Sequence, residues 1–166
     1  YNRDKGVGVT IYDGQKRGYA STSDFSKDAL KATVDAAVSI ARFTAPDAAS
    51  GLPDEALLAK DFPDFDLYHP WKISTEDAIE LASRCERAAF AVSPEIRNSD
   101  GASVSMQESH FISANSLGFM GGYASSRHYL SCSVIAGEGD DMQRDDWYST
   151  KRDPAELADA DEIGTF

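Results

Sequence analysis

The side chains best suited to hold a metal ion lie in the second half of the chain. Glu108 and His110 are two positions apart in a segment of alternating pattern, so they share one face of the expected strand. His128 lies on the next expected strand, where antiparallel pairing would let it approach His110. The metalloprotease spacing His-Glu-x-x-His is absent from the sequence. Glu108, His110 and His128 are therefore a candidate metal site, and the simpler alternative is a solvated polar sheet face.

The sequence contains no complete arrangement for nucleophilic catalysis or phosphate binding. Gly-x-Ser-x-Gly is absent, and Cys132 lies four residues from His128 on one strand, roughly 13 Å away, too far for a hydrogen bond. Residues 6–8, Gly-Val-Gly, precede a strand, unlike a dinucleotide-binding loop. Gly121 and Gly122 inside an expected strand predict a bulge or a close approach of backbone. No residue is assigned a catalytic role.

The densest group of carboxylates lies around an expected hairpin turn, without the spacing of a calcium loop, so we expect a solvated hairpin. Its members are Glu138, Asp140, Asp141, Asp145 and Asp146. Arg127 and Arg144 could face these acids in an ion-pair network. We expect Arg127, His128 and Arg144 to be the residues that face a substrate or a partner.

Composition excludes several classes of protein. The chain has 166 residues, with 16 Lys and Arg against 28 Asp and Glu, which gives a net charge of −12. Such acidity argues against binding to nucleic acid, and no apolar run approaches the roughly 20 residues of a membrane span. At 42% hydrophobic residues the chain can bury a core. Cys85 and Cys132 are expected to be reduced and buried.

The fold class expected from these patterns is α+β. Residues 7–12 and 17–22 flank an Asp-Gly turn and predict a hairpin, and a stripe over residues 27–42 predicts a helix behind Ser26. Residues 44–72 lose periodicity but keep aromatic residues, which predicts an ordered crossover.

A second helix is expected up to Val92, behind the capping residue Ser74. Strands are expected over residues 102–113, 119–136 and 142–150, as an antiparallel meander on which this helix packs. We expect one domain over residues 1–60 and another over 61–166. The chain begins at Tyr1 and ends on an uncapped acidic stretch, so we expect a piece of a longer polypeptide.

Collinear blocks of the sequence resemble the PmbA branch, also called TldE, of the TldD/PmbA family. The blocks are GVTIY (8–12), GYASTSD (18–24), IARFTAPD (40–47), DLYHP (66–70), DAIELA (77–82), GY (122–123), SRH (126–128), CSVIA (132–136) and GDDMQRD (139–145). Family members are known as modulators of DNA gyrase and as subunits of a cytoplasmic TldD–PmbA metalloprotease that processes or degrades unfolded peptides.

The resemblance implies a TldD-like partner subunit, an extended peptide substrate, no nucleic acid and no membrane. It places zinc on a His-Glu-x-x-x-His motif of the TldD-type partner and implies no cofactor for this fragment. By the same resemblance, residues 1–60 are the end of the family's N-terminal domain and residues 61–166 its middle domain, with the C-terminal domain absent. The alternatives are a binding or regulatory protein without proteolytic activity, and a hydrolase that uses Glu108, His110 and His128.

Overall fold

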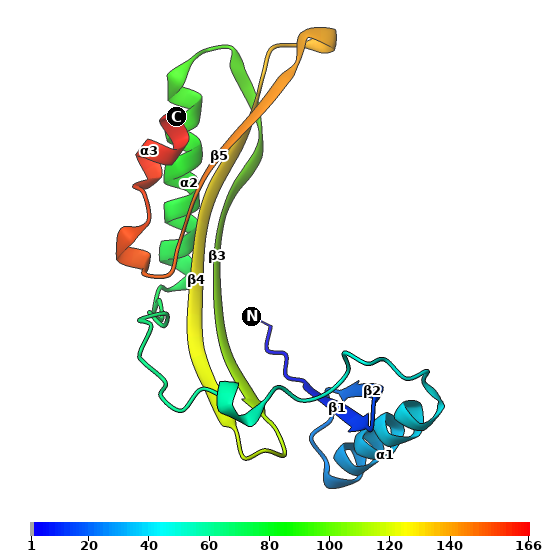
Figure 1. Ribbon diagram of the computed structural model, residues 1–166. Coiled ribbons are helices and arrows are strands. Elements are labelled where there is room, and N and C mark those ends of the chain that lie inside the picture. Colours follow the sequence, from blue (N-terminus) through cyan, green and yellow to red (C-terminus); the bar gives the residue numbers. More distant parts are fainter. Residues whose placement is uncertain (1) are drawn as a thin grey trace. The chain divides into compact units, whose positions relative to one another are not determined.

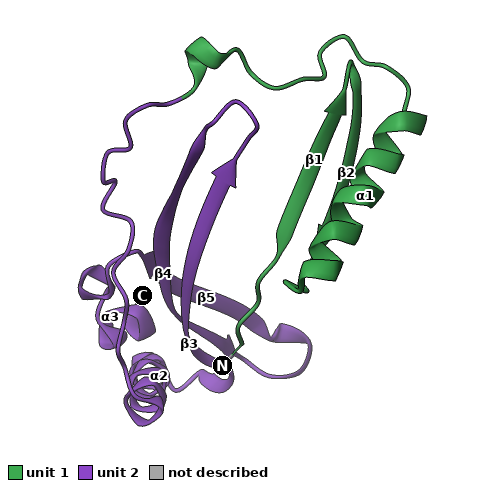
Figure 2. Ribbon diagram, turned by 90° about the horizontal axis from the view of Figure 1, so that it is seen from below, with its two compact units in different colours: residues 1–58 green, residues 59–166 purple. Residues whose placement is uncertain are grey.

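The structure is a computed structural model that describes residues 2–166, and its chain divides into two compact units. The first unit ends at Leu58, and the second comprises Ala59–Phe166 (Figure 2). This division lies two residues before the boundary expected at residue 60. Within residues 2–166, three helices and two antiparallel sheets make the fold α+β, which confirms the expected class.

The first unit is a β-hairpin covered by a helix. β1 (Val7–Asp13) pairs antiparallel with β2 (Lys16–Thr22), and Gly14 adopts the left-handed conformation that the tight turn requires (Figure 1). α1 (Lys27–Phe43) begins behind Ser26, whose hydroxyl accepts a hydrogen bond from the amide of Ala29 at 3.3 Å. The helix therefore begins at its expected residue and extends one residue further than expected.

The crossover between the expected domains is ordered but mostly irregular. Its regular part is a 3₁₀ turn, η1 (Glu55–Leu57). Residues 59–72 belong to the second unit, where the Leu67 carbonyl accepts a hydrogen bond from the amide of Ser126 at 2.9 Å. The prediction of an ordered crossover is confirmed in this part.

The second unit is a three-stranded antiparallel meander with helices on one face. α2 (Thr75–Val92) is capped by Ser74 as expected. The strands β3 (Ile96–Ala114), β4 (Met120–Ala136) and β5 (Gln143–Lys151) pair in the order β3-β4-β5 (Figure 1). Two short 3₁₀ turns, η2 (Gly139–Asp141) and η3 (Pro154–Glu156), and α3 (Ala160–Thr165) complete the unit.

Two features of this unit differ from expectation. β3 begins six residues earlier than predicted, because register irregularities near Asn98 and Ser99 let a segment without alternation continue the ladder. The acidic C-terminal stretch contains α3, which was not predicted. Its cap is Asp159, whose carboxylate accepts a hydrogen bond from the amide of Asp161 at 2.9 Å.

The core of the second unit lies between the two helices and one face of the sheet. It contains Cys85, Ala89, Leu130, Cys132, Ala160 and Ile163. Both cysteines are free and buried, as expected, and burial raises the pKa of the Cys85 thiol to about 12. None of the described helices is long and apolar enough to cross a membrane.

Candidate functional site

Three segments of the second unit meet at Ser126 of β4. The Ser126 hydroxyl accepts a hydrogen bond from the amide of His69 and donates one to the carbonyl of Arg152, each at 2.8 Å. The side chain is 2% exposed. Because the hydroxyl is buried and engaged both as donor and as acceptor, Ser126 is a structural anchor and is not placed to act as a nucleophile.

His128 is the second anchor at this junction. Its Nε2 lies 2.7 Å from the carbonyl oxygen of His69, and since a carbonyl only accepts, Nε2 carries the hydrogen and donates it. The ring of Trp71 packs edge-on against the imidazole, with 5.5 Å between the ring centroids. His128 is fully buried. The structure therefore corrects the expectation that this side chain faces a substrate or partner, because the segment before α2 covers it.

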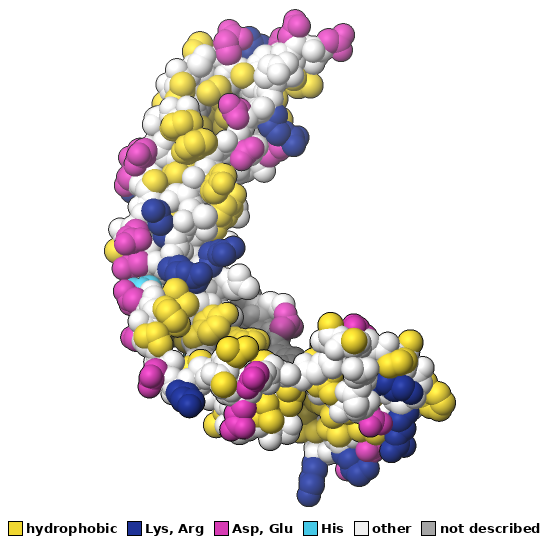
Figure 3. All heavy atoms as spheres, in the orientation of Figure 1, with side chains coloured by type: hydrophobic (Ala, Val, Ile, Leu, Met, Phe, Trp, Pro, Cys, Tyr) yellow, Lys and Arg dark blue, Asp and Glu magenta, His cyan; other side chains and the backbone are white. Residues whose placement is uncertain are grey.

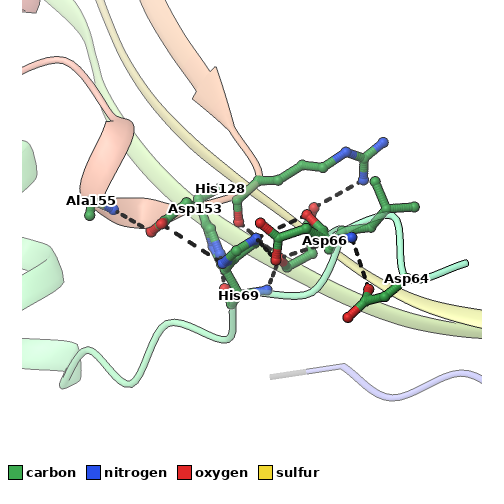
Figure 4. Close-up of polar contacts among 9 residues, drawn as sticks. Asp64, Asp66, His69, His128, Asp153 and Ala155 are labelled. Atoms are coloured by element: carbon green, nitrogen blue, oxygen red, sulfur yellow. Dashed lines mark hydrogen bonds and ion pairs between the residues drawn. The ribbon is translucent and has the colours of Figure 1, made fainter.

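His69 joins the same segment to the region after β5 (Figure 4). Its Nε2 donates a hydrogen bond to the carbonyl of Asp66 at 3.0 Å, and its Nδ1 lies 3.8 Å from the carboxylate of Asp153. The hydrogen bond to Asp66 is the largest cause that raises the pKa of His69, and the carboxylates of Asp66 and Asp153 act in the same direction. The imidazole of His69 thus links the segment before α2, through Asp66, to the segment after β5, through Asp153.

Glu108 and His110 share a sheet face, as expected, and the strand register places His128 on that face as well but away from His110 along the strands. His110 lies opposite Ala124 while His128 lies opposite Met106, an offset of four residues or roughly 13 Å along the strands. Glu108 instead accepts a hydrogen bond from the hydroxyl of Tyr68 at 2.8 Å. Residues 2–166 bring together no group of three His, Cys, Asp or Glu side chains that could hold a metal ion.

The expected ion-pair network around the acidic hairpin takes a different form. Arg144 pairs at 2.8 Å with Asp100 of β3, and Arg97 pairs with Glu138. Arg127 is exposed and lies opposite Gln107 on the sheet face away from the helices. Each of these ion pairs therefore joins β3 to β5 or to the turn between β4 and β5, across the width of the sheet.

A groove of about 590 Å³ lies between the segment before α2 and the end of the β3–β4 hairpin. We call it the aromatic groove, and its principal side chains are Phe62, Phe65, Tyr68, Phe111, Phe119 and Tyr123. Asp64 and Asp66 also line it. The space-filling view shows hydrophobic and acidic side chains next to one another on the visible face of the second unit (Figure 3).

The two glycines of β4 shape this groove. A Cβ on Gly121 would overlap the ring of Phe62, and a Cβ on Gly122 would overlap the carbonyl oxygen of Phe111 on β3. The close approach predicted for this Gly-Gly pair is therefore confirmed, whereas the ladder shows no register shift there.

Neither the contacts of His69 nor the aromatic groove was predicted from the sequence. The available signal for the groove was the run of aromatic residues in a segment without periodicity, which indicated packing but no partner. For the contacts of His69 the signal was weaker, because His69, Ser126 and Asp153 lie far apart in sequence.

Two models of one protein family match the chain. The PmbA/TldA metallopeptidase central domain matches residues 68–165, and the PmbA/TldA metallopeptidase domain 1 matches residues 1–41. The two matches lie in the second and first unit, respectively.

Curated relatives agree with these matches. The chain is 42% identical to Metalloprotease PmbA of Escherichia coli O157:H7 over 99% of this chain and 36% of that protein. It is also 42% identical to the Metalloprotease PmbA homolog of Haemophilus influenzae, over 92% of this chain and 34% of that protein. The chain thus spans about a third of the length of these relatives.

Solved structures share the fold at low sequence identity. A protein of Thermotoga maritima, described as a modulator of a DNA gyrase, superposes with a TM-score of 0.80 at 16% identity, over 98% of this chain and 36% of that one. TldE from Thermococcus kodakarensis gives a TM-score of 0.68 at 17% identity, over 90% of this chain and 33% of that one.

Proposed function

This chain belongs to the PmbA/TldD metallopeptidase family, and from that premise we propose that it is part of a PmbA-type subunit of a cytoplasmic TldD–PmbA peptidase complex. The subunit contributes surface that encloses an unfolded peptide, and zinc is held by the TldD-type partner. The observation that carries the proposal is the 42% identity to a metalloprotease over 99% of this chain.

The sheet face away from the helices has the chemistry of a contact surface. Arg127 is exposed there, and Tyr129 and Tyr148 pair their rings with centroids 5.7 Å apart on neighbouring strands. Arginine and tyrosine are enriched where proteins bind one another. We therefore assign this face to the peptide or to the partner subunit, with Arg127 as its charged contact.

The test uses the full-length protein, alone and mixed with its TldD-type homologue. We expect bound zinc and cleavage of an unstructured peptide only in the mixture, and loss of both on addition of a chelator. Zinc-dependent cleavage by the PmbA-type protein alone would overturn the division of roles. A mixture that forms no complex and cleaves nothing would favour the alternative, a binding or regulatory protein without proteolytic activity.

A matched pair of variants tests the assigned face. Arg127→Ala should reduce cleavage by the mixture, roughly tenfold if one charged contact to substrate or partner is lost, without changing its zinc content. Arg87→Ala is the control, because Arg87 is 61% exposed on α2 and, among residues 2–166, its ion-pair partner is Glu80 of its own helix. Equal activity of both variants would remove Arg127 from the contact surface.

A further inference from the structure

The outer edge of β4 has no strand beside it where it borders the aromatic groove. β3 pairs with β4 as far as Met120, whereas pairing with β5 stops at His128. Within residues 2–166 no strand pairs with residues 120–124 on the β5 side. An edge of this kind presents backbone donors and acceptors.

The direction of these backbone groups follows from Ser126. Its amide donates to Leu67 on the β5 side of β4, at 2.9 Å. Because backbone groups alternate between the two edges of an antiparallel strand, the N–H and C=O groups of Gly122 and Ala124 point to the same side. Both residues line the aromatic groove. The groove therefore combines an open strand edge with apolar walls.

The walls offer exposed rings to a side chain that enters the groove. Phe65 is 66% exposed and Tyr123 is 54% exposed. Phe111 and Tyr123 pair with centroids 5.7 Å apart, as do Phe62 and Phe119 at 5.9 Å. Burial of such rings is the largest source of affinity at small apolar sites.

The charged side chains that line the groove are all acidic. Asp64 and Asp66 are its charged lining residues, and among the described residues that line it there is no lysine or arginine. The carboxylate of Asp66 is 86% exposed. A cationic side chain fits this rim, whereas an acidic one would be repelled.

We infer that the aromatic groove binds an extended peptide, which adds a strand to β4 at Gly122 and Ala124, places an aromatic side chain against Phe65 and Tyr123, and sets a neighbouring lysine or arginine beside Asp64 and Asp66. Main-chain pairing supplies affinity in this mode of recognition, and the pocket supplies specificity. The inference rests on the proposed function, because it names a site for the peptide that the complex processes.

Binding is measured by fluorescence anisotropy with the full-length protein alone. The probe is a short labelled unstructured peptide that contains Lys-Phe pairs, and a second peptide has Glu in place of Lys. We expect the Lys-Phe peptide to bind more tightly. A third peptide, N-methylated at alternate residues, keeps its side chains but loses the donors for strand pairing, and we expect its binding to be lost.

Variants in the groove separate the contribution of the aromatic rings to peptide binding from that of the carboxylates. Phe65→Ala should weaken binding of both unmethylated peptides roughly tenfold. Asp64→Asn, which keeps the acceptor for the amide of Asp66, should weaken only the Lys-Phe peptide, by roughly threefold. Ile79→Ala is the control, because Ile79 is 61% exposed on α2 outside the groove. Full binding by Phe65→Ala, or equal binding of the methylated peptide, would overturn the inference.

Cleavage by the same variants, mixed with the TldD-type homologue, distinguishes failure of the peptide site in the groove from failure of the proposed peptidase function. Cleavage that is unaffected by Phe65→Ala, together with absence of peptide binding by the protein alone, would refute the groove as a peptide site and leave the complex intact. Peptide binding with the expected variant pattern, in a mixture that cleaves nothing, would support the groove and refute the proposed peptidase function.

Discussion

The Nε2 atom of His128 lies 2.7 Å from the carbonyl oxygen of His69, so a buried imidazole of β4 holds the segment that precedes α2. Two further hydrogen bonds fix the same segment, from the amide of Ser126 to Leu67 and from the amide of His69 to the Ser126 hydroxyl. This segment forms one wall of the aromatic groove, and its attachment therefore determines whether the groove exists.

Replacement of His128 by alanine should release this segment. The substitution removes a hydrogen bond and leaves a cavity, which together should lower the free energy of docking by about 3 kcal/mol. Lys60 and Lys72 are exposed at the two ends of the segment, so limited trypsin digestion reports its release. Cleavage at these lysines should accelerate strongly in His128→Ala and stay near the wild-type rate in Ile79→Ala, whose side chain is 61% exposed on α2. Similar rates in both variants would contradict the anchoring role.

Attachment of the segment should also depend on pH through His69. Its pKa is raised in the folded protein, most by the hydrogen bond to Asp66 within the segment and further by Asp153 and Glu156 outside it, and the contribution of these last two makes protonation favour the docked segment. The stabilisation is therefore fully present below the ordinary pKa near 6.5 and is lost as pH rises through the higher folded value. The groups that face the ring are Asp66, Asp153 and Glu156.

The measurement is the rate of trypsin cleavage at Lys60 and Lys72, corrected for the intrinsic pH dependence of the protease on a model peptide. The corrected rate should rise between pH 6 and pH 8 in the wild type and stay flat in His69→Gln. A wild-type rate that falls over this interval would show that the sign is wrong.

Gly164 should be required for the docking of α3. A Cβ at this position would overlap the carbonyl oxygen of Cys85 and lie 2.9 Å from the amide nitrogen of Ala89, both backbone atoms of α2. Gly164→Ala should therefore destabilise the α2–α3 packing by about 2 kcal/mol. Hydrogen exchange of the α2 and α3 amides measures this change. Gly51→Ala is the control, because a Cβ at Gly51 meets no atom within 4 Å, and unchanged exchange in both variants would refute the close contact.

The two cysteines should resist alkylation in the folded protein. Burial raises the pKa of Cys85 to about 12, so almost none of this thiol is ionised at pH 8. Burial also raises the pKa of Cys132. Iodoacetamide followed by mass spectrometry should modify neither residue in native protein and both in urea. Ser103→Cys supplies an exposed thiol on the open sheet face as a positive control. Rapid native labelling of Cys85 would show that the core opens readily.

Helical stripes and strand alternation predicted the helices and strands that are long enough to show such a pattern. The stripes of α1 and α2 and the alternation within β3 and β4 are properties of neighbouring residues, so a single segment contains the whole signal. α3 was not predicted, because its six residues are too few to show a helical periodicity. A helix this short is stable only where it packs on another element, and α3 packs on α2 through Gly164.

In the candidate site, too, local pattern predicted some properties of single residues and tertiary packing decided the others. The alternation placed Glu108 and His110 on one sheet face, and the register of the structure adds His128 to that face. The register then set His110 four residues out of line with His128, and the segment before α2 buried one imidazole while it left the other exposed. Neither outcome is encoded in the spacing of these three residues.

By itself the sequence determined the fold class, the places of the main helices and strands, and the resemblance to a family, because each is carried by the order and the local pattern of residues. Only the tertiary structure decided that His128 is an anchor, that Glu108 binds Tyr68, and that an open strand edge borders an aromatic groove. The physical reason is that these relationships join segments far apart in the chain, as His69 and His128 are, 59 residues from one another. Their partners are fixed by strand register and packing of the whole unit, and no local pattern records that choice.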